Sequence, residues 1–177
     1  MKQKIILAGG PSTGKSSVIN ELKAKGYPCL DESFRELLDK ERENDTGVNF
    51  GNTPLEFSYS IYRSRYAQYV EGDKFPVSFY DRSLIDVLAY LDMEHIAYPL
   101  EWQKTIEEKK YHTKVFYFPM WKDIYTQDEH RLESWEEALK VDKAIRKKYI
   151  YEGYDLIEVP LMKVEERTEF ILKKCFS

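Results

Sequence analysis

Short runs of apolar residues alternate with longer amphipathic stretches along the whole chain. The apolar runs occupy residues 4–9, 27–30, 75–82, 113–119 and 155–160. Their short length and their content of β-branched and aromatic residues predict strands. The stretches between them repeat apolar residues every three or four positions, which predicts helices. The predicted helices are 15–27, 31–43, 55–70, 83–93, about 100–110, 134–154 and a last one from about Lys163.

This alternation predicts one α/β domain over residues 1–177. Parallel strands need crossover connections, and helices of the predicted length supply them. We therefore expect a five-stranded parallel sheet covered by helices on both faces, a three-layer α/β/α arrangement. The irregular segments 44–54 and 119–133 are the expected places for a substrate-binding loop and a lid, because functional loops connect the rigid elements of such folds.

The segment GGPSTGKSS follows the first predicted strand and opens the first predicted helix. It satisfies the pattern G-x-x-x-x-G-K-[ST], and this strand–loop–helix context is the one in which the pattern binds phosphate. Backbone N–H groups of such a loop surround the phosphates, and the helix N-terminus adds positive partial charge. The predicted nucleotide-binding residues are Gly9, Gly10, Pro11, Ser12, Thr13, Gly14, Lys15, Ser16 and Ser17. Lys15 is expected to reach the β- and γ-phosphates and Ser16 to ligate Mg²⁺.

Acidic and basic residues follow the third predicted strand. Ligands of open parallel sheets bind beyond the carboxyl ends of the strands, and the run VSFYDRS places Asp81 and Arg82 there. We expect Asp81 to hold Mg²⁺ directly or through water, and Arg82 to bind a phosphate or an anionic substrate group. The alternative is that Asp81 or Ser83 only caps the next helix and that Arg82 is solvated.

The second predicted strand ends in LDESFRE. A kinase needs a base beside the acceptor hydroxyl, and Glu32 could supply it. Arg35 lies one helical turn further and could address the same substrate. The alternative stays open here, because acids in the first turn of a helix are favoured by the helix dipole alone.

Two further groups of charged residues allow functional and structural interpretations. Arg131, in DEHRLES, could close over the phosphates as a lid arginine; the alternative is a solvated side chain near a helix start. Arg63, Arg65 and Gln68 could recognise an acceptor, but their pattern on the tyrosine-rich helix favours a solvated face.

Composition narrows the class of protein. Apolar residues make up 42% and charged residues 33%, with a net charge of −4. This balance argues against a protein that mainly coats nucleic acid. The two cysteines, Cys29 and Cys175, are too few for a disulfide framework and are expected to be buried thiols. The N-terminal apolar run is too short for a signal peptide and no run is long enough to span a membrane, so we expect a cytoplasmic protein.

The ordered set of motifs resembles the NadR-like P-loop proteins, which include ribosylnicotinamide kinases. More widely, the chain is similar to nucleoside and nucleotide monophosphate kinases, and deoxynucleoside kinases share a glutamate after strand two and an acid-Arg-Ser triplet after strand three. The resemblance covers nearly the whole chain and rests on GGPSTGKSS, DESFRELL, FYDRSLIDVLAY, DEHRLES and GYDLIEVP.

The resemblance implies a P-loop NTPase fold and phosphoryl transfer from ATP or GTP, with Mg²⁺, to a small nucleoside-like hydroxyl acceptor. It makes Glu32 or Asp81 the base and Arg82 a substrate clamp. Lys15 and Arg131 become the stabilisers of charge on the transferring group. The acceptor side is expected in a helical region at about 44–75 and the lid at about 119–134.

The competing hypothesis is a nucleotide-dependent switch or binding module without a small-molecule acceptor. Ras-type GTPases carry N-K-x-D and D-x-x-G, and neither pattern occurs in the chain. AAA+ motors carry a second helical subdomain, for which 177 residues leave no room. A 5′-kinase acting on nucleic acid is disfavoured by the acidic balance and by the lack of a basic stripe.

Overall fold

The computed structural model describes residues 2–31, 53–125 and 134–176. Its strands are β1 (Gln3–Ala8), β2 (Cys29–Leu30), β3 (Val77–Asp81), β4 (Lys114–Tyr117) and β5 (Asp155–Glu158). Its helices are α1 (Lys15–Ala24), α3 (Pro54–Glu71), α4 (Leu84–Met93), α5 (Leu100–Glu108), α6 (Trp135–Tyr151) and α7 (Val164–Phe176), with short 3₁₀ turns at Gly72–Lys74 and Lys122–Ile124. The predicted helix 31–43 lies almost wholly outside the described residues.

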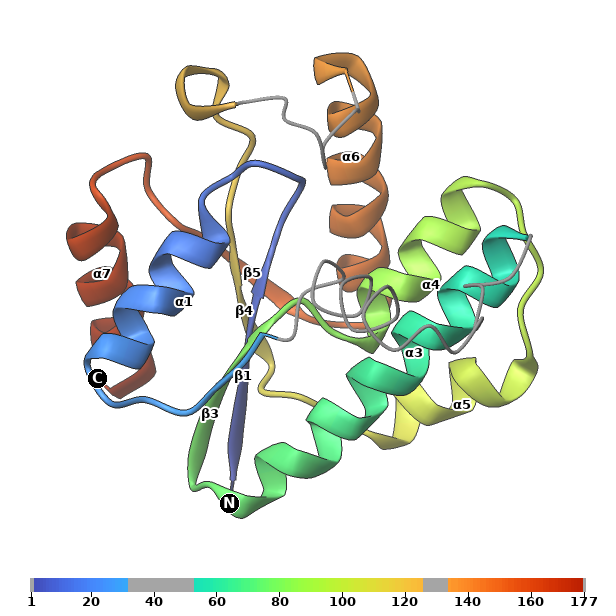
Figure 1. The fold of residues 1–177 in the computed structure, drawn as a ribbon, viewed down its shortest axis with the longest axis horizontal. Coiled ribbons are helices and arrows are strands. Elements are labelled where there is room, and N and C mark those ends of the chain that lie inside the picture. Colours follow the sequence, from blue (N-terminus) through green and yellow to red (C-terminus); the bar gives the residue numbers. More distant parts are fainter. Residues whose placement is uncertain (1, 32–52, 126–133, 177) are drawn as a thin grey trace, which may run out of the picture.

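The sheet is five-stranded and entirely parallel, in the order β2-β3-β1-β4-β5 (Figure 1). Strand β1 occupies the centre, and its register pairs Leu7 with Asp81 of β3. The loop that follows β1 and the turn that follows β3 therefore emerge side by side. This arrangement confirms the predicted parallel α/β fold and brings two of the predicted site segments together.

Alternate residues of β1 face opposite layers, as the period of a strand requires. Ile5 and Leu7 pack in a core with α1 and α7, whereas Ile6 and Ala8 pack in a second core with α3, α4, α5 and α6. Figure 1 shows the same division, with α1 and α7 on one side of the sheet and the other four helices opposite. Because both faces are covered, β1, β3 and β4 are mostly buried and read as nearly continuous apolar runs, whereas the edge strand β5 is partly exposed.

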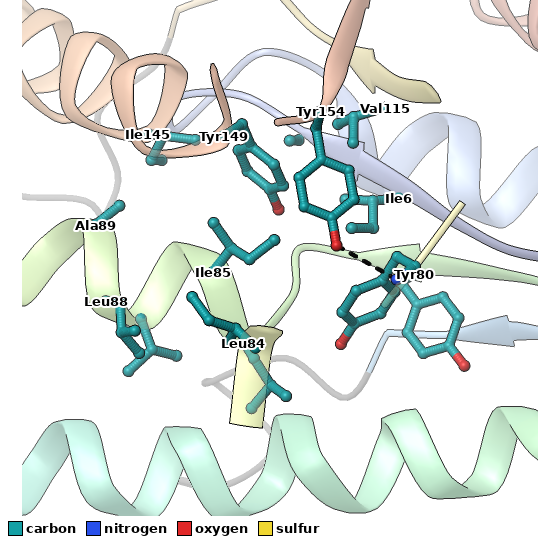
Figure 2. Close-up of a cluster of buried hydrophobic side chains, with 14 of the residues drawn as sticks. Ile6, Tyr80, Leu84, Ile85, Leu88, Ala89, Val115, Ile145, Tyr149 and Tyr154 are labelled. Carbon is teal, nitrogen blue, oxygen red and sulfur yellow. Dashed lines mark hydrogen bonds between the residues drawn. The ribbon is translucent and has the colours of Figure 1, made fainter. Parts of the chain in front are cut away.

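The larger core is rich in tyrosines, and two of them, Tyr117 and Tyr149, hydrogen-bond to carboxylates through their hydroxyl groups. Figure 2 shows Tyr149 between Ile145 of α6 and Ile85 of α4, with Tyr154 beside it. The Tyr149 and Tyr154 rings meet edge to face with centroids 5.8 Å apart, an arrangement that the quadrupoles of the rings favour. This cluster fixes α4 and α6 against each other and against the sheet.

The helix starts follow the capping signals in the sequence. Ser134 and Glu137 form a capping box at the start of α6, where the predicted helix 134–154 begins. Ser83, and not Asp81, caps α4, where its side chain accepts from the backbone N–H of Ile85. Each box satisfies N–H groups that the helix itself leaves unpaired.

None of the helices in the described part of the chain has the length and apolar character needed to span a bilayer. The two cysteines differ slightly from expectation, because Cys29 and Cys175 are half-buried rather than fully buried. Burial still raises the pKa of each thiol to about 12, so both are protonated at neutral pH.

Candidate active site

The loop between β1 and α1 has the backbone conformation of a phosphate cradle. Gly9, Ser12 and Gly14 have φ values of 137°, 56° and 82°. A Cβ atom on Gly9 would lie 2.3 Å from the backbone oxygen of Phe118, so this position accepts only glycine. The loop is thus a compact turn pressed against the end of β4, and it delivers the chain into the N-terminus of α1.

The side chain of Lys15 is buried against this loop. Its Nζ donates to the backbone oxygens of Gly9 at 3.0 Å and Gly10 at 2.6 Å, and to Oγ1 of Thr13 at 2.9 Å. Burial and the neighbouring Arg82 lower the pKa of Lys15 to about 7, against the opposing effect of nearby carboxylates. Lys15 is therefore a desolvated cation that an anionic ligand at the loop would stabilise.

Ser16 and Asp81 meet where β1 and β3 end. The Ser16 hydroxyl donates to Oδ2 of Asp81 over 3.5 Å, while Oδ1 of Asp81 is buried without a hydrogen-bond partner among the described residues. A buried carboxylate oxygen with no donor is expensive, and a hydroxyl beside it completes the oxygen pair that P-loop proteins offer to Mg²⁺. The two side chains therefore fit this ion.

The described residues contain no cluster of three or more His, Cys, Asp or Glu side chains able to hold a metal on their own. This fits magnesium, which proteins commonly hold through one or two side chains together with substrate phosphates and water. Ser16 and Asp81 would supply those side chains here.

Arg82 follows Asp81 in an unusual backbone conformation. Its φ of 70° lies in the left-handed region, which costs energy in a residue with a Cβ and is concentrated at functional sites. The backbone N–H of Arg82 donates to the oxygen of Leu7 at 3.1 Å. Its Nη1 lies 3.5 Å from Oδ1 of Asp86. The turn thus holds a guanidinium, with its counter-ion, next to the phosphate loop.

Arg65 and Gln68 of α3 correct the expectation of a solvated face. Both are buried, with exposed fractions of 8% and 5%, whereas Arg63 is exposed as expected. Arg65 Nη1 donates to Oε1 of Gln68 at 3.0 Å, and Nε2 of Gln68 is buried without a partner in the described part of the chain. Burial lowers the pKa of Arg65, and the carboxylates of Asp81 and Asp86 oppose this shift. The hydrophobic periodicity of the helix predicted the wrong environment for these two residues, because it treats every polar position as solvent-facing.

Arg167, in the first turn of α7, is a loop contact that the sequence reasoning missed. Its Nη1 donates to the backbone oxygen of Thr13 at 3.2 Å, and a Cβ on Gly14 would lie 2.6 Å from the same nitrogen. Burial lowers the pKa of Arg167, and no carboxylate in the described ranges opposes that shift. A signal was present, since a cation in the first turn of a helix gains nothing from the dipole.

Asp142, in the middle of α6, is the second missed contact. Its Oδ1 accepts from the backbone N–H of Gly10 at 3.0 Å and from the hydroxyl of Tyr117 at 2.7 Å. The position lies next to Val141 on the apolar face of the helix. An acid on an apolar stripe is the signal that could have identified it.

The predicted residues now divide into two sets. The structure brings the loop 9–17, Asp81 and Arg82 together at one edge of the sheet. Glu32, Arg35 and Arg131 lie outside the described residues, and their parts in the site stay predictions. Asp31, the last described residue before that gap, pairs with Lys23 of α1 at 2.6 Å.

Comparison with solved structures identifies the fold. Deoxyadenosine kinase from M. mycoides matches with a TM-score of 0.70 and 18% identity, covering 98% of both chains. Thymidylate kinase from Ehrlichia chaffeensis matches with a TM-score of 0.62 and 13% identity over 98% of both chains. NadR in complex with NR matches with a TM-score of 0.65 and 10% identity, over 97% of this chain and 51% of that one. These likenesses confirm the predicted P-loop kinase fold.

No curated protein matches the chain. A protein family described as "AAA domain" matches residues 4–167, which includes the phosphate loop, the β3 turn and Arg167. This match concerns the nucleotide-binding domain and does not bear on the second subdomain of AAA+ motors. The family match and the likeness in fold to NadR and to the kinases agree with the predicted NadR-like P-loop fold. The chain belongs to this AAA domain family.

Proposed function

We propose that this protein is a small-molecule kinase that transfers the γ-phosphoryl group of ATP or GTP to a hydroxyl of a nucleoside-like acceptor. One observation carries the proposal. Asp81 lies 3.5 Å from Ser16 of the phosphate loop, and its charge acts on the pKa of both Lys15 and Arg65. A carboxylate shared between a phosphate cradle and a buried guanidinium is what a two-substrate site requires.

The donor half consists of the loop 9–17 and its supports. Backbone N–H groups of the loop bind the phosphates, and Lys15 stabilises charge on the transferring group. Ser16 and Asp81 hold Mg²⁺, which when bound neutralises charge on the phosphates. Arg167 adds a second buried cation at Thr13. Asp81 is then occupied as a metal ligand, which leaves the role of base to Glu32.

The acceptor half is cationic. The carboxylates of Asp81 and Asp86 oppose the effect of burial on the pKa of both Arg82 and Arg65. The two guanidinium groups therefore lie close to these carboxylates, on the β3 side of the loop. Gln68 brings an amide nitrogen that is buried without a partner in the described part of the chain, and such a donor is stabilised by an acceptor atom of a substrate. We further propose that Arg35 and the region 44–75 complete the acceptor half. Arg131 is proposed to close over it as part of a lid at about 119–134.

The named structures support a nucleoside-like acceptor. They include a deoxyadenosine kinase with bound dATP and a NadR protein with NAD and AMP-PNP. This chain spans about half of that NadR chain, so we propose only the kinase step for it.

A product screen tests the proposal. The full chain is incubated with Mg-ATP or Mg-GTP and single nucleosides, including nicotinamide riboside, deoxyadenosine and thymidine, and with nucleoside monophosphates. We expect one acceptor class to yield a phosphorylated product detected by mass spectrometry. Nucleotide binding without stimulation by any acceptor would contradict the kinase and favour the nucleotide-dependent switch, in which case a partner should bind only one nucleotide state.

A further inference from the structure

Helix α6 contacts both halves of the proposed site. Asp142 and Tyr149 both lie on α6 and are seven residues apart (149 − 142 = 7), which is about two helical turns, so their side chains leave the same face. Asp142 reaches the phosphate loop, and Tyr149 reaches the turn between β3 and α4. One rigid helix thus joins the donor and acceptor halves.

On the donor side, the hydroxyl of Tyr117 contacts the carboxylate of Asp142, and this carboxylate binds the phosphate loop. Tyr117 of β4 is fully buried, and its hydroxyl lies within donating distance of two oxygens of Asp142, Oδ1 at 2.7 Å and the backbone oxygen at 2.8 Å. Oδ1 also accepts the backbone N–H of Gly10 at 3.0 Å. A Cβ on Gly10 would lie 3.1 Å from Cβ of Asp142, so the loop and the carboxylate are in close contact. Without the Tyr117 hydroxyl, Oδ1 of Asp142 keeps the Gly10 N–H as its one donor among the described residues, so the carboxylate is held less firmly.

On the acceptor side, a second tyrosine hydroxyl holds the counter-ion of Arg82. Tyr149 is fully buried, and its hydroxyl donates to Oδ2 of Asp86 at 2.5 Å. The backbone N–H of Ser83 donates to the same oxygen at 2.8 Å. The other oxygen, Oδ1, lies 3.5 Å from Nη1 of Arg82 and has no hydrogen-bond partner in the described ranges. This carboxylate is therefore one of the groups that face the Arg82 guanidinium, together with Tyr90 and Asp81.

Both hydroxyls stay protonated and act as donors at neutral pH. Burial raises the pKa of Tyr117, and Asp142 raises it further. Burial and the charge of Asp86 raise the pKa of Tyr149 in the same way. Each tyrosine thus gives a charge-assisted hydrogen bond to a carboxylate, which is stronger and more directional than a neutral one.

We propose that Tyr117 and Tyr149 are positioning residues for separate halves of one site. Tyr117 sets the phosphate loop through Asp142, and Tyr149 sets Arg82 through Asp86, while α6 fixes the two halves relative to each other. This inference rests on the proposed function, because it treats Arg82 as an acceptor residue. It does not require either tyrosine to touch a substrate.

The test compares two deletions of a single hydroxyl, Tyr117→Phe and Tyr149→Phe, which keep both rings in the core. Mg-ATP binding is measured by calorimetry without acceptor, and the acceptor KM by product formation. We expect Tyr117→Phe to weaken ATP binding by about tenfold and to leave the acceptor KM within about twofold. Tyr149→Phe is expected to do the reverse, because small misplacements of positioned groups have large kinetic effects.

Tyr154→Phe is the matched control. Its ring packs on Tyr149 (Figure 2). Among the described residues, its hydroxyl accepts only a backbone N–H, that of Tyr111, at 3.3 Å. It should lower thermal stability without moving either kinetic parameter. The proposal is overturned if one variant moves both parameters by the same factor, if neither variant moves its own parameter, or if Tyr154→Phe has the effect of Tyr149→Phe.

A separate measurement keeps the inference distinct from the kinase proposal. In arginine-labelled protein, the Nε–H resonance of Arg82 reports its orientation without any acceptor. We expect Tyr149→Phe to shift this resonance and Tyr154→Phe and Tyr117→Phe to leave it in place. If no acceptor is ever phosphorylated but the shift occurs, the positioning role stands and the kinase assignment fails. If the resonance does not move, the role of Tyr149 is wrong whatever the enzyme does.

Discussion

The hydroxyl of Ser16 lies 3.5 Å from Oδ2 of Asp81, at the edge where the central strand β1 and its neighbour β3 end. Parallel register brings the two together, since Leu7 pairs directly with Asp81. The contact joins the phosphate loop to the strand-end acid, and it leaves Oδ1 of Asp81 buried without a partner in the described part of the chain. A divalent cation beside the two side chains would satisfy that oxygen.

Asp81→Asn tests this assignment directly. An amide is a weaker magnesium ligand and carries no charge, so we expect phosphoryl transfer or hydrolysis to fall by at least about a hundredfold. Nucleotide binding in the absence of Mg²⁺ should change little, because the loop 9–17 is intact. Kinetics over a series of Mg²⁺ concentrations measure both effects.

Asp155→Asn is the control for that variant, since Asp155 is an exposed aspartate at the start of β5. It should keep the parent rate and the parent Mg²⁺ dependence. Wild-type turnover by Asp81→Asn at every Mg²⁺ concentration would show that Asp81 is not the metal ligand.

The pKa of Lys15 predicts that nucleotide affinity depends on pH. In the free protein this pKa is lowered to about 7 by burial and by Arg82, so Lys15 loses its proton as the pH rises above that value. Bound phosphates favour the ammonium form, so binding takes up a proton. Affinity should therefore fall as pH rises above 7, by up to about tenfold per pH unit. Calorimetry in buffers of different ionisation enthalpy measures the proton uptake.

Two lysine variants distinguish the titration of Lys15 from the titration of other groups as the cause of the pH dependence. Lys15→Met should bind weakly with no pH slope of this kind. Lys4→Met should keep the slope, because Lys4 of β1 is equally buried but is paired with Asp73 at 3.0 Å. A slope that persists in Lys15→Met would assign the titration to another group.

The sequence predicted the architecture well because strands and helices differ in the spacing of their apolar residues. The alternation of strand and helix predicts the parallel sheet, and the residue pattern 9–16 identifies the phosphate loop. Ser134 likewise marked the start of α6 through its capping box. These features are local, so a window of a few residues contains the information.

The buried polar residues on both sides of the site could not be predicted in the same way. Arg65, Gln68 and Asp142 are polar residues whose burial depends on segments distant in the sequence, so periodicity classed them as solvent-facing or left them unnoticed. Arg167 meets Thr13 across 154 positions, a pairing that no local pattern encodes. Asp81 was easier, because the rule for strand ends in parallel sheets placed it.

Arg65 provides a prediction on the acceptor side. Arg65→Gln removes a buried cation that interacts electrostatically with Asp81 and Asp86. The acceptor KM should therefore rise by about tenfold or more, which corresponds to the loss of one hydrogen bond to a charged group. ATP binding should change by less than about twofold, because Arg65 has no contact with the loop 9–17 among the described residues. Arg63→Gln, an exposed change on the same helix, should leave both parameters unchanged. If the two substitutions changed the acceptor KM equally, Arg65 would not be an acceptor-binding residue.

Arg167 provides the last prediction, on the donor side. Its guanidinium lies 5.9 Å from the Phe118 ring and 5.7 Å from the Trp121 ring, is 5% exposed, and has Nε without a partner in the described ranges. A buried cation without a carboxylate is destabilised until an anion approaches. Arg167→Met should therefore weaken ATP binding by about tenfold or more, and Arg167→Lys should recover part of the loss.

The readout for Arg167 has to separate charge from helix packing. Thr168→Val alters the next residue of α7, which is fully buried and donates its hydroxyl to the backbone oxygen of Val164 at 2.9 Å. It should lower the melting temperature while keeping ATP affinity within about twofold. Binding of inorganic tripolyphosphate should follow ATP in every Arg167 variant, because the missing charge acts on the phosphates. If Thr168→Val loses as much ATP affinity as Arg167→Met, the contribution of Arg167 is packing and not charge.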